Sequence, residues 1–137
     1  MLRGICQCGG VQITLDAVDP IGFNCYCSIC RKVAGAPFSS AVVVRPGALR
    51  VDQGSELLAK YNATANYDRW HCSCCHTAIY GEVTDQGETP LYVSAAILDP
   101  DEIKYVVFDH IFVRSLVPWY QITDDRPRHE AYPDEEA

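Results

Sequence analysis

The sequence contains no hydrophobic run long enough to cross a membrane. A membrane-spanning helix needs about 20 mostly apolar residues, whereas the longest uninterrupted apolar segments, such as residues 41–44, have the length of a strand. Residues 1–4 also lack the apolar stretch of a secretory signal peptide. We therefore expect a cytoplasmic protein with no membrane partner, in a compartment where thiols stay reduced.

The sequence is also poor in positive charge. It has 11 Lys and Arg residues against 18 Asp and Glu residues, which gives a net charge of -7. A protein that binds nucleic acid usually carries a basic surface, so we expect no nucleic-acid partner. An anionic small molecule can still bind wherever a few of the basic side chains gather.

Sustained helical periodicity, internal repeats and low-complexity tracts are missing as well. Short segments rich in Val, Ile and Tyr alternate instead with turn residues, which is typical of an all-β domain. The expected strands are residues 10–16, 39–45, 49–51, 56–61, 67–72, 78–83, 91–98 and 105–113. Single helical turns are expected at residues 28–33 and 101–103. The sequence thus predicts a mostly β fold.

The length and composition fit one domain with one core. The chain has 137 residues, of which 48% are hydrophobic and 21% charged, an ordinary globular balance. We place the domain at residues 1–123. The remaining residues, 124–137, are polar and acidic and contain two prolines, so we expect an irregular C-terminal tail.

The cysteines carry the chemistry of this sequence. Eight cysteines form three runs, Cys6-x-Cys8, Cys25-x-Cys27-x-x-Cys30 and Cys72-x-Cys74-Cys75. Cysteines one or two residues apart are poorly placed to form disulfides. The same spacing suits zinc, because four thiolates about 2.3 Å from the metal lie just under about 4 Å from one another. Zinc also prefers thiolate ligands in a reduced cell, so the runs predict zinc sites.

The number of ligands divides the cysteines between two sites. The first and third runs supply a four-cysteine cluster: Cys6, Cys8, Cys72 and Cys75. Four ligands make a closed tetrahedral site of the structural kind. The middle run supplies a three-cysteine cluster: Cys25, Cys27 and Cys30. Three ligands leave one position for water or substrate, as in catalytic zinc sites. The alternatives are a fourth protein ligand at the three-cysteine cluster, or buried free thiols throughout.

Several residues near these runs have more than one interpretation. His71 and His76 flank the third run and could ligate metal, although a histidine at position 76 also suits a turn with positive φ. His110 is either a core residue or a substrate contact. Cys74 is either an inert thiol or a spare ligand.

These motifs resemble the glutathione-dependent formaldehyde-activating enzyme family, also called the CENP-V/GFA domain family. The resemblance covers the three cysteine runs in order, the turn at residues 98–100, and the segments 110–114, 118–120 and 124–127. It implies a β-tent fold of short antiparallel strands with two zinc ions per chain. It also implies that the four-cysteine cluster is structural and the three-cysteine cluster catalytic. The chain departs from the family pattern at Tyr26, where histidine is common, and at His76, where glycine is usual.

The resemblance implies a zinc-dependent carbon–sulfur lyase-type enzyme, similar to S-(hydroxymethyl)glutathione synthase. Such an enzyme acts on a small-molecule thiol like glutathione and a small aldehyde, or on their adduct. The catalytic residues would be Cys25, Cys27 and Cys30, through the open zinc site. The expected substrate contacts, chosen by position and charge, are Tyr26, Arg31, Lys32, His110 and Arg114. The alternative is a non-catalytic, zinc-stabilised β-tent module that binds a protein partner.

Overall fold

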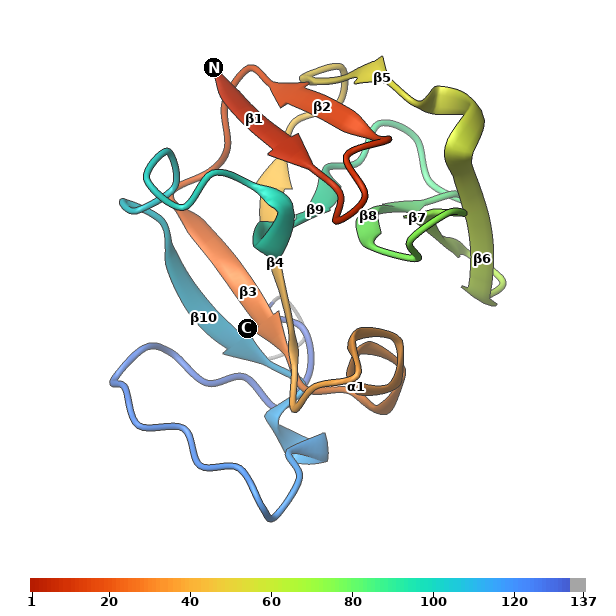
Figure 1. Cartoon of the computed structure of the whole chain (residues 1–137). Helices are drawn as coiled ribbons and strands as arrows, with labels where there is room; N and C mark the ends of the chain where they lie inside the picture. The colour runs from red at the N-terminus through yellow and green to blue at the C-terminus, as the bar shows by residue number, and fades with distance from the viewer. Residues whose placement is uncertain (134–137) are drawn as a thin grey trace.

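The computed structural model describes residues 1–133 of the chain. Within these residues, ten short strands form two sheets, and one α helix and three 3₁₀ turns connect some of them (Figure 1). The predicted mostly β fold is therefore confirmed. In this part of the chain, no helix has both the length and the apolar character needed to span a membrane.

The smaller sheet has three antiparallel strands in the order β1-β2-β5. They are β1 (Leu2–Ile5), β2 (Gln12–Leu15) and β5 (Leu49–Gln53). Between β1 and β2 the chain turns through residues 6–10, where Gly9 has a φ of 80° and the Cys6 N–H donates to the Val11 carbonyl at 3.1 Å. A positive φ is readily adopted by glycine because it lacks a Cβ. The turn holds Cys6 and Cys8 at one end of the sheet.

The larger sheet has seven strands in the order β10-β3-β4-β9-β8-β7-β6. They are β3 (Ile21–Cys25), β4 (Ser39–Val44), β6 (Leu58–Thr64), β7 (Tyr67–Cys72), β8 (Ala78–Val83), β9 (Leu91–Ser94) and β10 (Val107–Ile111). All neighbours pair antiparallel except β3 and β10, which run parallel with Ile111 opposite Cys25. Figure 1 shows these two strands side by side, with the helix α1 (Ser28–Ala34) just beyond the end of β3.

Two strands, β1 and β3, were not expected from the sequence. Each contains a glycine, which weakens the sequence signal for a strand. In both strands another part of the chain closely approaches the glycine. A Cβ at Gly22 would lie 2.6 Å from the Ala41 carbonyl oxygen, and one at Gly4 would lie 3.0 Å from Leu98. The contacts that favour these strands are therefore tertiary.

Other differences concern where elements end and how they pair. The strand expected at 91–98 ends at Ser94, and residues 95–97 form a 3₁₀ turn. The helical turn expected at 28–33 is a seven-residue helix capped by Cys27 and by Gly35, whose φ is 64°. The strands pair antiparallel, as expected, except for β3 and β10, which run parallel. Parallel pairing requires a long crossover between the two strands, which no local pattern reveals.

The hydrophobic core lies between the two sheets. Leu15 from the smaller sheet and Val42 and Val93 from the larger sheet are fully buried in one cluster. Cys6 and Cys72 belong to the same cluster, with exposed fractions of 3% and 0%. The four-cysteine cluster is thus built into the core where the sheets meet.

After β10 the chain loops round, and a later segment lies beside β10 in the parallel direction through an isolated bridge between His110 and Arg128. The His110 N–H donates to the Pro127 carbonyl at 2.9 Å, and the His129 N–H donates to the His110 carbonyl at 2.8 Å. Ile122 and Ala131 are buried, each at 6% exposure. Residues 124–132 contain no helix and, apart from the isolated bridge at Arg128, no strand, but they pack against the domain. The rest of the expected tail, 134–137, lies outside the described residues, and the proposed boundary at residue 123 stays a prediction.

Candidate metal centres

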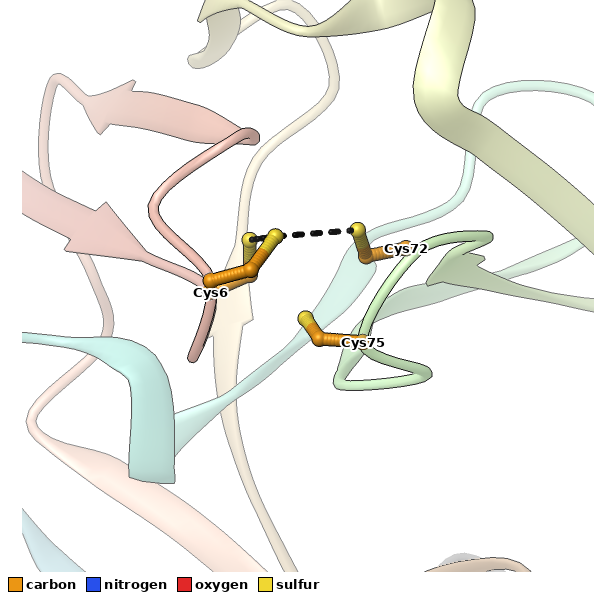
Figure 2. Close-up of side chains that lie close together, drawn as sticks. Cys6, Cys72 and Cys75 are labelled. Carbon is orange, nitrogen blue, oxygen red and sulfur yellow. Dashed lines mark hydrogen bonds between the residues drawn. The ribbon is translucent and has the colours of Figure 1, made fainter.

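The four-cysteine cluster brings together segments from both sheets. Cys6 and Cys8 come from the β1–β2 turn, Cys72 ends β7, and Cys75 lies in the turn before β8. Figure 2 shows the sulfurs of Cys6, Cys72 and Cys75 pointing toward one another. All four sulfurs lie within 4.8 Å of one another, and the separations are 3.6 Å for Cys6–Cys8 and 3.8 Å for Cys8–Cys72.

These distances fit zinc. Four thiolates about 2.3 Å from a tetrahedral metal lie about 3.8 Å apart. Neutral donors also support the sulfurs, because the Val11 N–H donates to Cys6 Sγ at 3.2 Å. Hydrogen bonds from the Thr77 side chain and backbone lower the pKa of Cys75 to about 5. Cys75 is therefore prepared to bind a metal as thiolate.

The other candidates around the third run do not join this cluster. Cys74 is exposed, and neither His71 nor His76 places a ring nitrogen among the converging sulfurs. His76 has a φ of 63°, and its N–H donates to the Cys72 carbonyl at 2.7 Å. His76 therefore closes the turn that carries Cys72 and Cys75, directly after the second of these two ligands.

The three-cysteine cluster is local. Cys25 ends β3, Cys27 caps the N-terminus of α1, and Cys30 lies in the first turn of α1. The Cys30 N–H donates to Cys27 Sγ at 3.3 Å, and the three sulfurs lie within 4.8 Å of one another. Hydrogen bonding to the Cys25 and Cys30 thiols lowers the pKa of Cys27 to about 2. The same contacts raise the pKa of Cys25. The cluster thus favours a thiolate at Cys27 even before any metal binds.

This second cluster has an incomplete ligand set. Within residues 1–133, no His, Asp, Glu or further Cys contributes a fourth ligand atom to the group. The two clusters together could hold metal ions, and the donor type and spacing of both are consistent with zinc. The described part of the chain thus contains one four-ligand and one three-ligand site.

Arg69 is a cation of the second site that the sequence analysis did not identify. Arg69 lies on β7, 39 residues after Cys30, and its Nη2 donates to Cys30 Sγ at 3.4 Å. Its guanidinium also lies over the Tyr67 ring, 5.2 Å from the ring centroid. Alternation along β7 places Arg69 and Tyr67 on one face and Cys72 on the other, but only the sheet pairing shows that this face meets Cys30.

Tyr26 and His110, both expected as substrate contacts, lie in the interior with exposed fractions of 0% and 2%. The Tyr26 hydroxyl lies 2.8 Å from His110 Nδ1, and His110 Nε2 lies 2.9 Å from Asp124 Oδ1. The bond from His110 lowers the pKa of Asp124, so its carboxylate is ionised and can only accept. A neutral His110 therefore donates through Nε2 and accepts from Tyr26 at Nδ1. These hydrogen bonds join Tyr26, which lies between two cysteines of the three-cysteine cluster, to Asp124 in the C-terminal segment.

The three cations expected as substrate contacts lie around the same end of the molecule. Arg31 Nε donates to the Tyr26 carbonyl at 3.3 Å, and Lys32 is exposed on α1. Arg114 is exposed and lies over the Phe112 ring at 5.2 Å. In the described part of the chain, Arg69 is the only Arg or Lys side chain that donates to a sulfur of the three-cysteine cluster.

Replacing Tyr26 with phenylalanine tests the buried bond to His110. The change keeps the ring among Phe38, His110 and Tyr120 but leaves His110 Nδ1 without its partner. We expect the free energy of unfolding to fall by about 1–2 kcal/mol, measured by urea denaturation in zinc-containing buffer. Tyr61→Phe, at a ring that is 53% exposed, is the control and should change stability by less than about 0.5 kcal/mol. Equal stability of both variants would show that the bond contributes nothing.

The chain is similar to several known proteins. The model of a family described as glutathione-dependent formaldehyde-activating enzyme matches residues 1–115. A Halomonas elongata protein, provisionally named glutathione-dependent formaldehyde-activating enzyme, is 31% identical over 144 residues, covering 98% of this chain and 90% of that protein. A Sordaria macrospora protein with the same provisional name is 33% identical over 88 residues, covering 60% of this chain and 37% of that protein.

A solved structure supports the same relationship. The crystal structure of a Rhodobacter sphaeroides protein is 27% identical and superposes with a TM-score of 0.62, covering 77% of this chain and 98% of that one. The family match at residues 1–115 includes all the cysteines of both clusters. The resemblance seen in the sequence motifs is thereby confirmed. The chain belongs to the family of glutathione-dependent formaldehyde-activating enzymes.

Proposed function

We propose that this chain is a zinc-dependent carbon–sulfur lyase-type enzyme that acts on a thiol and a small aldehyde, or on their adduct. The observation that carries the proposal is the incomplete ligand set of Cys25, Cys27 and Cys30 within the described residues. The family match and the provisional name of the Halomonas elongata relative support glutathione as the thiol and formaldehyde as the aldehyde.

The ligand chemistry of the cluster favours thiol chemistry over hydrolysis. Three thiolates on a divalent ion leave a net charge of about -1, so bound water would be a weaker acid there than at a site of neutral histidines. Zinc bound by the three cysteines would supply a position for a soft sulfur ligand and a Lewis acid for the aldehyde oxygen. The cysteines fix that position beside α1, which brings thiol and aldehyde close together.

The proposed reaction balances without an oxidant or a reductant. The thiol loses its proton, and its sulfur electron pair forms the carbon–sulfur bond at the carbonyl carbon. The carbon–oxygen π bond breaks at the same time, and the oxygen that receives its electron pair accepts a proton. Cleavage of the adduct is the same sequence reversed. A cytoplasmic location is part of the proposal, because all eight cysteines are free thiols in this structure and require a reduced environment.

We assign the remaining residues by where they lie. Cys6, Cys8, Cys72 and Cys75 would hold a second, structural zinc ion. Arg31, Lys32 and Arg114 are proposed to meet the carboxylates of an anionic thiol such as glutathione. The buried pair Tyr26 and His110 would act by position, since their bonds to each other and to Asp124 hold the C-terminal segment against the cysteine knuckle.

A cobalt-substituted protein tests the proposal, because the visible spectrum of cobalt reports its coordination. Adding glutathione at millimolar concentration should change the wild-type spectrum. A Cys27→Ser variant has lost one of the three ligands, and its cobalt spectrum should not show the same change. Turnover can be followed in parallel as the loss of free thiol in the presence of formaldehyde.

An unchanged wild-type spectrum across several small thiols would contradict the proposal. That result would favour the non-catalytic zinc-stabilised module instead. A thiol-dependent spectrum that is identical in Cys27→Ser would show that the thiol binds elsewhere.

A further inference from the structure

The three-cysteine cluster has an unfavourable charge for the ligand that we assign to it. Three thiolates and one divalent cation already carry a net charge of -1. A fourth thiolate would make the net charge of the site -2, and Cys30 at this site is only 8% exposed. Repulsion between like charges grows as water is excluded, so a neutral ligand would be preferred unless a nearby cation offsets the charge.

Arg69 is placed to offset it. Its Nη2 lies 3.4 Å from Cys30 Sγ, and its Nε is buried with no hydrogen-bond partner. A half-buried guanidinium is poorly screened by solvent and keeps its charge at any ordinary pH. Its charge therefore acts directly on the sulfur cluster.

Neighbouring strands fix the position of this side chain. Arg69 pairs with Gly81 of β8, and Gly81 pairs with Tyr92 of β9. A Cβ at Gly81 would collide with the Tyr67 hydroxyl oxygen. Gly81 thus leaves room for the Tyr67 ring, and the Arg69 guanidinium packs over the face of that ring.

The four-cysteine cluster lacks such a cation. Within the described residues, the donors to its sulfurs from outside the cluster are neutral: the backbone N–H groups of Gly10, Val11 and Thr77, and the Thr77 hydroxyl. Its ligand set is complete, so it has no anion to admit. Of the two clusters, the one next to a cation, Arg69, is therefore the one with an open ligand position.

We propose that Arg69 makes the three-cysteine cluster selective for anionic ligands, thiolates above all, over neutral ones. The inference rests on the proposed function, because that function requires the cluster to take a thiolate. It adds a residue that determines which ligand the site accepts. Arg69 acts through charge and through its hydrogen bond to Cys30.

The test compares three ligands on the cobalt-substituted protein. 2-Mercaptoethanol provides a thiolate, azide an anion without sulfur, and imidazole a neutral ligand. Affinities are measured from the visible spectrum for wild type, Arg69→Gln and Arg69→Lys. Lys60→Gln is the matched control, because it removes a positive charge from the neighbouring strand β6 at a side chain that pairs with Asp68 instead of the cluster.

In Arg69→Gln, we expect mercaptoethanol and azide to bind about ten- to a hundredfold more weakly, the effect of one unit charge at short range. Imidazole should change by less than about threefold. Arg69→Lys should recover most of the anion affinity, and Lys60→Gln should match wild type. If Arg69→Gln fails to bind cobalt, the Arg69→Lys variant provides the test. This variant keeps the positive charge, so a loss of its azide affinity would contradict a charge effect.

Other results would overturn the inference. Unchanged anion affinities in Arg69→Gln would exclude a charge effect, and equal losses for all three ligands would indicate a structural role only. The proposed function fails on its own if wild type binds azide and imidazole but no thiol. The role of Arg69 can still be tested in that case, from the ratio of the azide and imidazole affinities. A wild-type protein that binds none of the three has no open position, which contradicts both proposals.

Discussion

Replacing Cys72 with serine should leave the protein unfolded or insoluble. Cys72 is fully buried, and its sulfur lies 3.8 Å from that of Cys8, which comes from the other sheet. Structural zinc contributes on the order of 10 kcal/mol to folding, which is comparable with the whole stability of a domain. We expect little soluble protein, and circular dichroism of any soluble fraction should show the loss of β structure.

Cys27→Ser is the matched control, because it removes one sulfur from the other cluster. The three cysteines there are separated by at most five positions, so losing that site releases only the end of β3 and the start of α1. The variant should stay folded, with the same far-ultraviolet spectrum as wild type and less bound zinc. If Cys27→Ser unfolds the chain as severely as Cys72→Ser, the division into a structural and a catalytic site is wrong.

Zinc should leave the protein in two stages. Elemental analysis of protein purified in zinc-containing buffer should give two zinc ions per chain. A chromophoric chelator should first remove one ion from the three-cysteine cluster, because three ligands and an open position hold the metal less tightly than a closed set of four. The second ion should leave only as the fold is lost, since Cys6 and Cys72 are core residues.

Metal release and circular dichroism, recorded together, check this order. The first ion should leave without a change in the far-ultraviolet spectrum, and the second with loss of β structure. Release of both ions in one step that coincides with unfolding would contradict two sites of different kinds. A zinc content near zero, with the cysteines titrating as disulfides, would contradict zinc binding altogether.

The metal-binding groups were predictable because their geometry is local. Residues two apart in an extended chain point to the same side, as Cys25 and Cys27 do, and a helical turn brings Cys30 to the same point. The number of cysteines in each run then predicted one group of four and one of three, and the structure brings both groups together. The mostly β fold was equally readable, since strands such as 78–83 follow from short apolar segments between turn residues.

The strands β1 and β3 were not predictable in the same way. Gly4 and Gly22 carry no side chain to mark a strand, and both lie in close contact with distant parts of the chain. The parallel pairing of β3 with β10 depends likewise on a crossover of many residues. Such contacts appear only once the sheets are assembled.

The surroundings of the three-cysteine cluster were decided by tertiary structure alone. Local alternation places Tyr26 opposite to Cys25 and Cys27, but only the fold shows that it reaches His110 and, through it, Asp124. Arg69 of β7 reaches Cys30 of α1 although three strands separate β7 from β3 in the sheet. The sequence by itself determined which atoms can bind a metal, because chelation depends on spacing over a few residues. Only the folded sheet decided that Arg69 contacts Cys30 and that His110 bonds to Tyr26, because these partners lie 39 and 84 positions apart in the sequence.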